Sequence, residues 1–255
     1  MSDSNGEAAE ESFISHLIEL RDRIVKAVYG LGLVCLILMV WPGPATIYDF
    51  LAQPMLESLP AGSQMIATGV ISPFLVPMKV TLLAAFVIAL PWVLYQVWAF
   101  IAPGLYAHEK RLIAPLVISS TLLFVAGVAF CYFLVFGRVF HFINEFAPQS
   151  IHVAPDIENY LDFIMSMCLA FGVTFEVPVV VVVLVRMGIV PLDKLKAIRP
   201  YVIVGAFIVA AVVTPPDVVS QFSLALPMWL LYELGLIVAP MFVRATKSPQ
   251  SEESI

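Results

Sequence analysis

A single glutamate, Glu176, lies deep inside a long apolar stretch, in the segment Ala170–Pro178. A carboxylate that faces lipid costs about 2.5–3.5 kcal/mol on insertion scales, so this side chain must meet something polar. The residues alone leave three roles open. Glu176 could relay protons, could bond inside the protein to Thr174, Gln221 or a backbone carbonyl, or could receive a polar residue from a partner's helix.

Two further acids lie close to apolar runs. Glu19 belongs to Phe13–Ile24, where apolar residues recur at helical spacing, which predicts an amphipathic helix at the membrane interface. Glu19 and Arg23 have the favourable i,i+4 order for an ion pair. Glu109 stands beside two basic residues after an aromatic segment and a Pro-Gly turn. By themselves these patterns favour a solvated helix face and an interfacial helix start.

The sequence shows no pattern typical of an enzyme or a metal site. His16 and Glu19 have i,i+3 spacing but no companion ligands, and no nucleophile or phosphate-binding loop stands out. Cys35, Cys131 and Cys168 lie within apolar runs without metal-ligand spacing, which is typical of small core residues. We therefore expect no enzyme, no cofactor and no metal.

The composition is that of a protein with many membrane spans. The 255 residues are 61% hydrophobic and 13% charged, with a mean hydropathy of +0.96. The acidic N-terminus lacks the basic region, short apolar core and cleavage site of a signal peptide. We therefore expect the first apolar run to remain as a membrane anchor.

Six apolar runs are candidates for spans, which need about 17–25 residues. They are Ile24–Trp41, Phe74–Ile101, Leu112–Phe136, Leu161–Val185, Tyr201–Val213 and Phe222–Val243. The fifth is short, because only about 13 helical residues fit between Pro200 and Pro215, roughly 20 Å against a bilayer core of about 30 Å. Pro91, Pro178 and Pro227 lie inside spans and should kink their helices.

These spans predict an all-α integral membrane protein, with six transmembrane helices in a bent, concave bundle. Residues 1–255 form one membrane domain, with a polar tail at 1–12, the six-span core at 13–243 and a C-terminal tail at 244–255. Six spans put both termini on one side, and that side holds eleven of the 13 basic residues, all except Lys79 and Arg138. The positive-inside rule therefore predicts cytoplasmic termini.

Several long motifs occur in an order that resembles one family. They are His-Leu-Ile-Glu-Leu-Arg-Asp-Arg (16–23), Ser-Pro-Phe (72–74), Gln-Val-Trp-Ala-Phe-Ile-Ala-Pro-Gly-Leu-Tyr (96–106), Phe-Gly-Val-Thr-Phe-Glu-Val-Pro (171–178) and Arg-Pro-Tyr to Thr-Pro-Pro-Asp (199–217). This set resembles TatC, the six-span core subunit of the twin-arginine translocase. The resemblance runs from the amphipathic helix through the last span.

The resemblance implies a receptor and scaffold of the bacterial inner membrane. Glu19 and Glu109 would form the cytoplasmic docking site for the twin-arginine motif of signal peptides on folded cargo, and Arg21 and Phe100 match other signal-binding positions. A guanidinium pairs bidentately with a carboxylate, so two arginines need two acids.

The resemblance also implies partner surfaces. Glu176 and Gln221 would dock the single helices of TatA- and TatB-type subunits, whose recruitment permits export driven by the proton-motive force. Pro54 and Asp217 match positions needed for assembly or transport, although Pro-Pro-Asp is also a common turn. We expect a homo-oligomer with these partners in the lipid bilayer, and no nucleic acid.

The roles of two residues are open, and two other functions of the protein are alternatives. Glu233 lies deep in its span and is assigned only an internal hydrogen bond, and Lys79 could snorkel to the interface. The alternative function is a proton-coupled small-solute transporter with Glu176 and Glu233 as relay acids, although no internal repeat is visible. A purely structural subunit would leave the paired cytoplasmic acids without a role.

Overall fold

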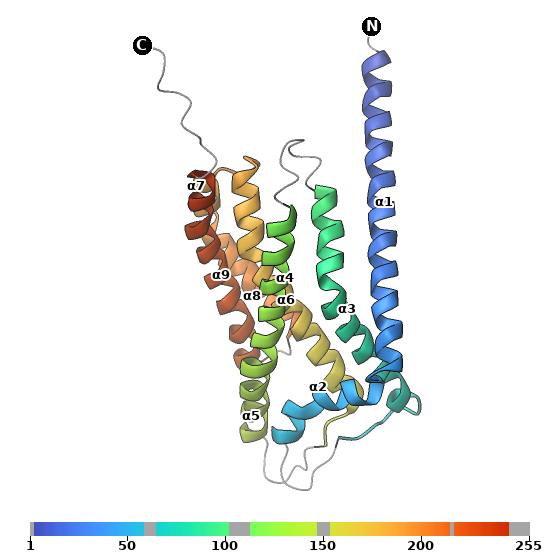
Figure 1. The fold of residues 1–255 in the computed structure, drawn as a ribbon. Coiled ribbons are helices and arrows are strands. Elements are labelled where there is room, and N and C mark those ends of the chain that lie inside the picture. The colour runs from blue at the N-terminus through green and yellow to red at the C-terminus, as the bar shows by residue number, and fades with distance from the viewer. Residues whose placement is uncertain (1–2, 59–64, 102–112, 147–153, 215–216, 245–255) are drawn as a thin grey trace. The chain divides into compact units, whose positions relative to one another are not determined.

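The computed structural model describes residues 3–58, 65–101, 113–146, 154–214 and 217–244 (Figure 1). The helices are α1 (Asp3–Val40), α2 (Pro44–Ser58), α3 (Ser72–Ile101), α4 (Ile113–Phe130), α5 (Phe136–Phe146), α6 (Ile157–Arg186), α7 (Leu192–Ala197), α8 (Arg199–Val213) and α9 (Val218–Arg244). A π-helical turn, Cys131–Val135, joins α4 to α5. Within the described ranges the only β pairing is one isolated bridge. The predicted all-helical fold is confirmed.

The lengths of the helices agree with the predicted spans. Five described helical stretches are long and apolar enough to cross a membrane: Ile14–Val40, Ser72–Ile101, Ile113–Phe142, Ile157–Arg186 and Val218–Met241. The shorter apolar helix is α8, whose 15 residues span about 22 Å. Pro200 lies in its first turn, and Thr214 is extended and ends it. The short fifth span is therefore confirmed.

The segment before the first span is continuous with that span. The sequence predicted an amphipathic helix at 13–24, and the structure has these residues in helix α1, which continues through the first span. No proline interrupts residues 13–40, and helix propagation is favourable once a turn has formed. The predicted helix at 13–24 is therefore confirmed as part of α1, and its place at the membrane interface stays a prediction.

The chain forms two compact units. Unit 1 contains residues 1–48 and 77–121, and unit 2 contains residues 49–76 and 122–255.

In unit 1, α1 packs on the second part of α3. The indole N–H of Trp92 donates to the backbone oxygen of Lys26 at 2.9 Å. A Cβ atom built at Gly30 would lie 2.3 Å from Trp92 Cδ1, so only glycine leaves room for the indole. Trp98 donates to Ser120 Oγ at 3.2 Å, and both side chains are buried. The Trp92 bond fixes the face of α3 that α1 contacts, and the Trp98 bond joins α3 to α4.

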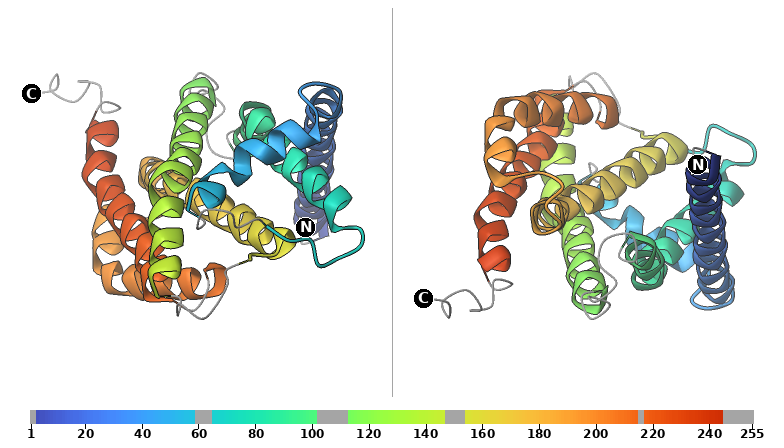
Figure 2. Two further views of the ribbon diagram at one scale, coloured as in Figure 1. Left: turned by 90° about the horizontal axis from the view of Figure 1, so that it is seen from below. Right: turned by 90° about the horizontal axis from the view of Figure 1, so that it is seen from above.

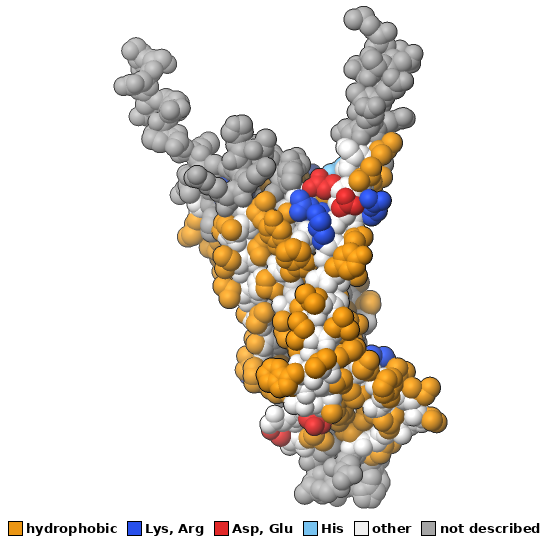
Figure 3. All heavy atoms as spheres, turned by 45° about the vertical axis from the view of Figure 1, so that its right-hand side comes forward, with side chains coloured by type: hydrophobic (Ala, Val, Ile, Leu, Met, Phe, Trp, Pro, Cys, Tyr) orange, Lys and Arg blue, Asp and Glu red, His pale blue; other side chains and the backbone are white. Residues whose placement is uncertain are grey.

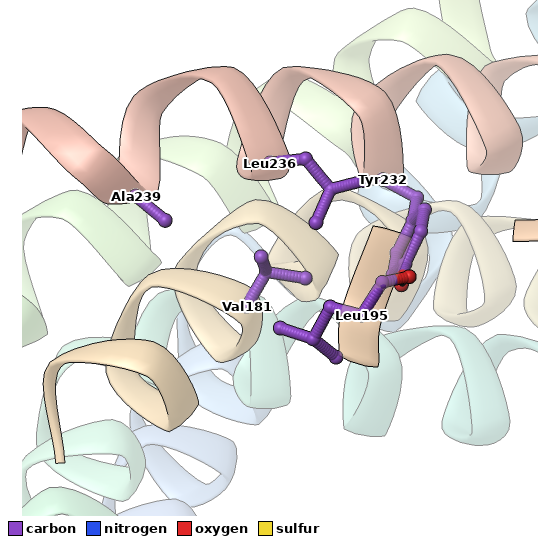
Figure 4. Packing of buried hydrophobic residues seen from close by; sticks show 5 residues of the cluster. All are labelled: Val181, Leu195, Tyr232, Leu236 and Ala239. Carbon is purple, nitrogen blue, oxygen red and sulfur yellow. Dashed lines mark hydrogen bonds between the residues drawn. The ribbon is translucent and has the colours of Figure 1, made fainter. Parts of the chain in front are cut away.

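In unit 2, α6, α7 and α9 share an apolar core. Val181, Leu195, Tyr232, Leu236 and Ala239 form this cluster, and Figure 4 shows their side chains pointing toward one another. The hydroxyl of Tyr232 also donates to the backbone oxygen of Leu195 at 2.7 Å, which anchors α7. The short helix α8 lies beside α9 (Figure 2).

A second seam of unit 2 joins α4 to α6. A Cβ atom at Gly127 would lie 2.6 Å from the backbone oxygen of Phe171 and 2.9 Å from Phe175 Cγ. Close approach of this kind between membrane helices depends on small residues, because lipid supplies no hydrophobic drive for association. Gly127 therefore sets how closely the two helices pack.

Helix α2 was not predicted from the sequence. Its residue Ala52 is buried, and Phe50 stacks on Tyr132 with ring centroids 5.3 Å apart. Tyr132 donates its hydroxyl to the backbone oxygen of Phe50 at 2.6 Å, and Tyr160 donates to that of Leu51 at 3.3 Å. Two tyrosines distant in sequence thus hold this helix in place.

A polar brace joins the segment before α3 to the start of α6. Ile66 N–H donates to Pro155 O at 3.0 Å and Ile157 N–H to Ile66 O at 2.9 Å. Asp156 caps α6 by accepting from the N–H groups of Glu158 and Asn159, each at 3.0 Å. Its other oxygen accepts from the hydroxyl and N–H of Thr68 at 2.6 and 3.0 Å.

These bonds make the brace sensitive to acid. Hydrogen bonds from Thr68, and then from the backbone, lower the pKa of Asp156 from 3.8 to about 2. A lowered folded-state pKa gives stability that is complete above 3.8 and is lost as the pH falls through about 2.

We expect Asp156→Ala to lower the melting temperature of the detergent-solubilised protein by about 2–4 °C near neutral pH. The difference from the parent protein should shrink as the pH falls from 3.8 to about 2, because the parent carboxylate then becomes protonated. Melting curves across this range check the prediction. Asp49→Ala, which removes an exposed acid within α2, is the control. A difference in melting temperature between Asp156→Ala and the parent that does not change with pH would contradict the assigned cause.

Candidate functional site

A polar site lies at one end of unit 1, where α1 and α3 meet. We call it the charged end; it comprises Glu19, Arg21, Asp22 and Arg23 on α1, with Gln96 and Phe100 on α3. Figure 3 shows acidic and basic side chains gathered on one stretch of the surface, with apolar side chains covering the region beyond it.

Glu19 is the accessible acid of this site. Its side chain is 38% exposed, and its Oε1 accepts from Arg23 at 3.2 Å. The helix supplies this pair directly, because residues i and i+4 lie on the same face. The predicted ion pair between Glu19 and Arg23 is confirmed.

Arg23 has a second acceptor that sequence reasoning missed. Its other terminal nitrogen donates to Oε1 of Gln96 at 3.4 Å. Gln96 is only 2% exposed, so this amide is part of the packed interior of unit 1. The signal that could have found it was an amide on a helix that is otherwise strongly apolar near this end.

Phe100 is brought to the same region by stacking. Its ring lies on that of His16, with centroids 4.4 Å apart and an interplanar angle of 20°. His16 is one turn before Glu19 on α1, so Glu19 and Phe100 occupy neighbouring parts of the charged end. The structure thus brings together two of the predicted signal-binding residues.

The other two residues predicted to bind the signal peptide are Arg21 and Glu109. Arg21 is exposed and donates to Asp22 Oδ1 from two nitrogens, at 2.9 and 3.1 Å, so its guanidinium lies away from Glu19. Glu109 lies outside the described residues. Of the two acids predicted to bind the signal peptide, Glu19 is therefore the one that belongs to the charged end.

Unit 2 holds the residues predicted to dock partners. Glu176 is half-buried in α6, two residues before Pro178. Gly235 of α9 packs against Pro178, since a Cβ there would lie 3.0 Å from Pro178 Cα. Gln221 lies 14 residues before Gly235, about 21 Å along the helix, so it is not the internal partner of Glu176.

The other predicted positions have structural contacts or lie outside the description. Asp217 accepts from the N–H of Ser220 at 2.7 Å and caps α9, in agreement with a turn role. Gln221 is half-buried, and its N–H donates to the backbone oxygen of Asp217 at 3.2 Å. The side chain of Pro54 lies outside the described residues, although its backbone belongs to α2.

Glu233 has a charged partner that was not predicted. Arg199, the first residue of α8, donates to its carboxylate at 2.7 Å. The hydrogen bond expected for Glu233 is thus confirmed, and its donor is a cation. A half-buried carboxylate in an apolar span favours such a donor, and the basic residue at the start of the preceding span was the available signal.

Comparisons with known proteins agree with the motifs. The family model for the Sec-independent protein translocase protein (TatC) matches residues 15–227. A TatC protein of Halothiobacillus neapolitanus is 50% identical over 98% of this chain and 69% of its own length. One from Escherichia coli is 47% identical over 91% of this chain and 90% of its own length.

A solved structure is also similar. A crystal structure described as the twin arginine translocase receptor TatC superposes with a TM-score of 0.78 at 34% identity, covering 89% of this chain and 98% of that chain. The same receptor in the detergent DDM gives a TM-score of 0.79, again at 34% identity.

Proposed function

The chain belongs to the TatC family, as a multi-pass inner-membrane subunit of the Sec-independent protein translocase, and we propose that it is the subunit that binds twin-arginine signal peptides. In this proposal the charged end receives the two arginines, and unit 2 receives the helices of partner subunits. The cargo is folded protein, and transport is driven by the proton-motive force.

One observation carries the receptor proposal. Glu19 is an accessible carboxylate beside an aromatic stack, on a helix held by a contact of Arg23 to the buried Gln96 of α3. A carboxylate binds a guanidinium with two parallel hydrogen bonds, and a flat aromatic surface also attracts the cation. Glu19 takes one arginine of the motif, and Glu109 takes the other.

The orientation follows from the same proposal. Signal peptides meet the receptor in the cytoplasm, so the charged end and both termini face that side. The distribution of basic residues supports this arrangement, because the predicted cytoplasmic segments hold all of them except Lys79 and Arg138.

Glu176 supports the second part of the proposal. A half-buried carboxylate in an apolar span can accept a hydrogen bond from a polar residue of a single-span TatA- or TatB-type helix. Gln221, in the first turn of α9, adds a second polar contact for such helices. We also propose that several copies of this chain assemble with these partners.

We expect Glu176→Ala to weaken partner association about threefold, since hydrogen bonds between membrane helices average roughly 0.6 kcal/mol and reach about 1.7 kcal/mol. Co-purification of an affinity-tagged chain with its single-span partner measures this. Glu176→Gln, which keeps hydrogen-bonding capacity, should retain most of the association. Unchanged recovery of the partner with Glu176→Ala would contradict the docking role.

Site-specific photo-crosslinking tests the whole assignment. A photoreactive residue at position 22, which is exposed in the same helical turn as Glu19, should crosslink to a twin-arginine signal peptide, and one at position 176 should crosslink to the partner subunit. A peptide with both arginines changed to lysine is the control, because lysine lacks the planar fork. Peptide crosslinks from position 176 alone would overturn the proposed receptor site.

A further inference from the structure

In the structure Glu19 is already bound to an arginine. The guanidinium of Arg23 donates to Glu19 Oε1 at 3.2 Å, which is the contact that an arginine of a signal peptide would make. The chain therefore holds, within its own sequence, a group of the same chemistry as the proposed ligand.

Arg23 is held on its other side as well. Its second terminal nitrogen donates to Gln96 Oε1 at 3.4 Å, and Gln96 belongs to a different helix and is buried. A guanidinium has five N–H donors in a rigid fork, so it can keep one acceptor while it releases the other. Loss of Glu19 therefore leaves Arg23 bonded to Gln96.

We propose that Arg23 is an internal competitor for the signal peptide: it occupies Glu19 in the resting receptor, and Gln96 retains Arg23 when a peptide arginine takes its place. This inference rests on the proposed receptor function. Gln96 acts as a positioning residue, because it binds Arg23 and does not contact the peptide.

The strength of the contact suits such an exchange. Partly exposed i,i+4 ion pairs are weak, so an incoming arginine displaces Arg23 at a cost of about twofold in affinity. A bidentate arginine from a peptide replaces a single hydrogen bond from Arg23, so it forms the stronger contact. The competitor lowers the apparent affinity of Glu19 for every cation by the same factor, and the bidentate contact of the motif arginine leaves it the stronger ligand.

Binding of a fluorescent twin-arginine peptide to the detergent-solubilised full chain tests the inference. We expect Arg23→Gln to raise the affinity about twofold to fivefold. The control is Lys26→Gln, which removes an equal charge from an exposed side chain one turn away on α1. Lys26→Gln should raise the affinity for the peptide by less than Arg23→Gln does. An equal rise in both variants would mean that the overall positive charge, and not competition by Arg23, weakens peptide binding.

Substitution of Gln96 provides a second, independent test of the inference in the same binding assay. Gln96→Met removes the acceptor while keeping the volume, so Arg23 should bind Glu19 alone and the affinity should fall about twofold. The double variant with Arg23→Gln should return to the affinity of Arg23→Gln by itself. A purely structural role of Gln96 predicts instead that the loss persists in the double variant.

The outcomes separate this inference from the proposed function. Glu19→Gln in the same assay tests the receptor site itself, and unchanged binding there would remove the proposed function. If Glu19→Gln abolishes binding while Arg23→Gln leaves it unchanged or weaker, the receptor site stands and the internal competitor is excluded.

Discussion

Glu19→Gln is expected to reduce the affinity for a twin-arginine peptide at least tenfold and to stop transport of folded cargo. The substitution keeps the shape of the side chain but removes the charge that pairs with the guanidinium. Hydrogen bonds to charged groups contribute about 1.5–3 kcal/mol, which corresponds to roughly 10- to 150-fold in affinity. Peptide binding to the purified chain and export from intact cells measure the two effects.

Asp22→Asn is the matched control for Glu19→Gln. Asp22 lies in the same helical turn and carries the same charge, but its carboxylate is exposed and bound to Arg21. Its removal should change the affinity no more than about twofold, as for most surface ion pairs. Similar losses of peptide affinity in Glu19→Gln and Asp22→Asn would mean that the charged end attracts peptides only through its overall electrostatic field.

Gly127→Leu is expected to prevent normal packing of α4 on α6. The nearest atom to the new Cβ would be the backbone oxygen of Phe171 at 2.6 Å, closer than real Cβ contacts allow. Backbone within a helix yields less readily than a side-chain tip, so the helices must separate. Overpacking of this kind costs about 1–3 kcal/mol or more. A lower melting temperature and a loss of monodisperse protein in size-exclusion chromatography would report it.

Gly137→Leu gives the matched comparison. This glycine lies in α5, and a Cβ built there meets nothing within 4 Å. The same change in volume and in helix propensity should therefore leave the melting temperature nearly unchanged. Equal destabilisation by both substitutions would contradict the importance of the α4–α6 seam.

Local patterns predicted the spans well. Apolar runs of sufficient length identified five of them, and Pro200 with Pro215 marked the short α8 between them. These features depend on neighbouring residues and on bilayer thickness alone. Helix α2 depends instead on hydroxyl groups of Tyr132 and Tyr160, which lie far along the chain, and no local pattern announces those contacts.

In the candidate site, contacts within one helix could be predicted from the sequence, whereas contacts between helices could not. The pair of Glu19 and Arg23 follows from i,i+4 spacing within one helix. The contact of Arg23 with Gln96 and the pairing of Arg199 with Glu233 join helices that are distant in sequence. Such contacts depend on which turns of two helices meet, and a single sequence does not specify that.

The ion pair of Arg199 and Glu233 has a consequence for biogenesis. Helix α8 has only 15 residues, and α9 carries an acid whose insertion alone would cost about 2.5–3.5 kcal/mol. When both helices enter the membrane together, the cation of the first neutralises the acid of the second. We therefore expect the translocon to release α8 and α9 into lipid as one hairpin and not one helix at a time.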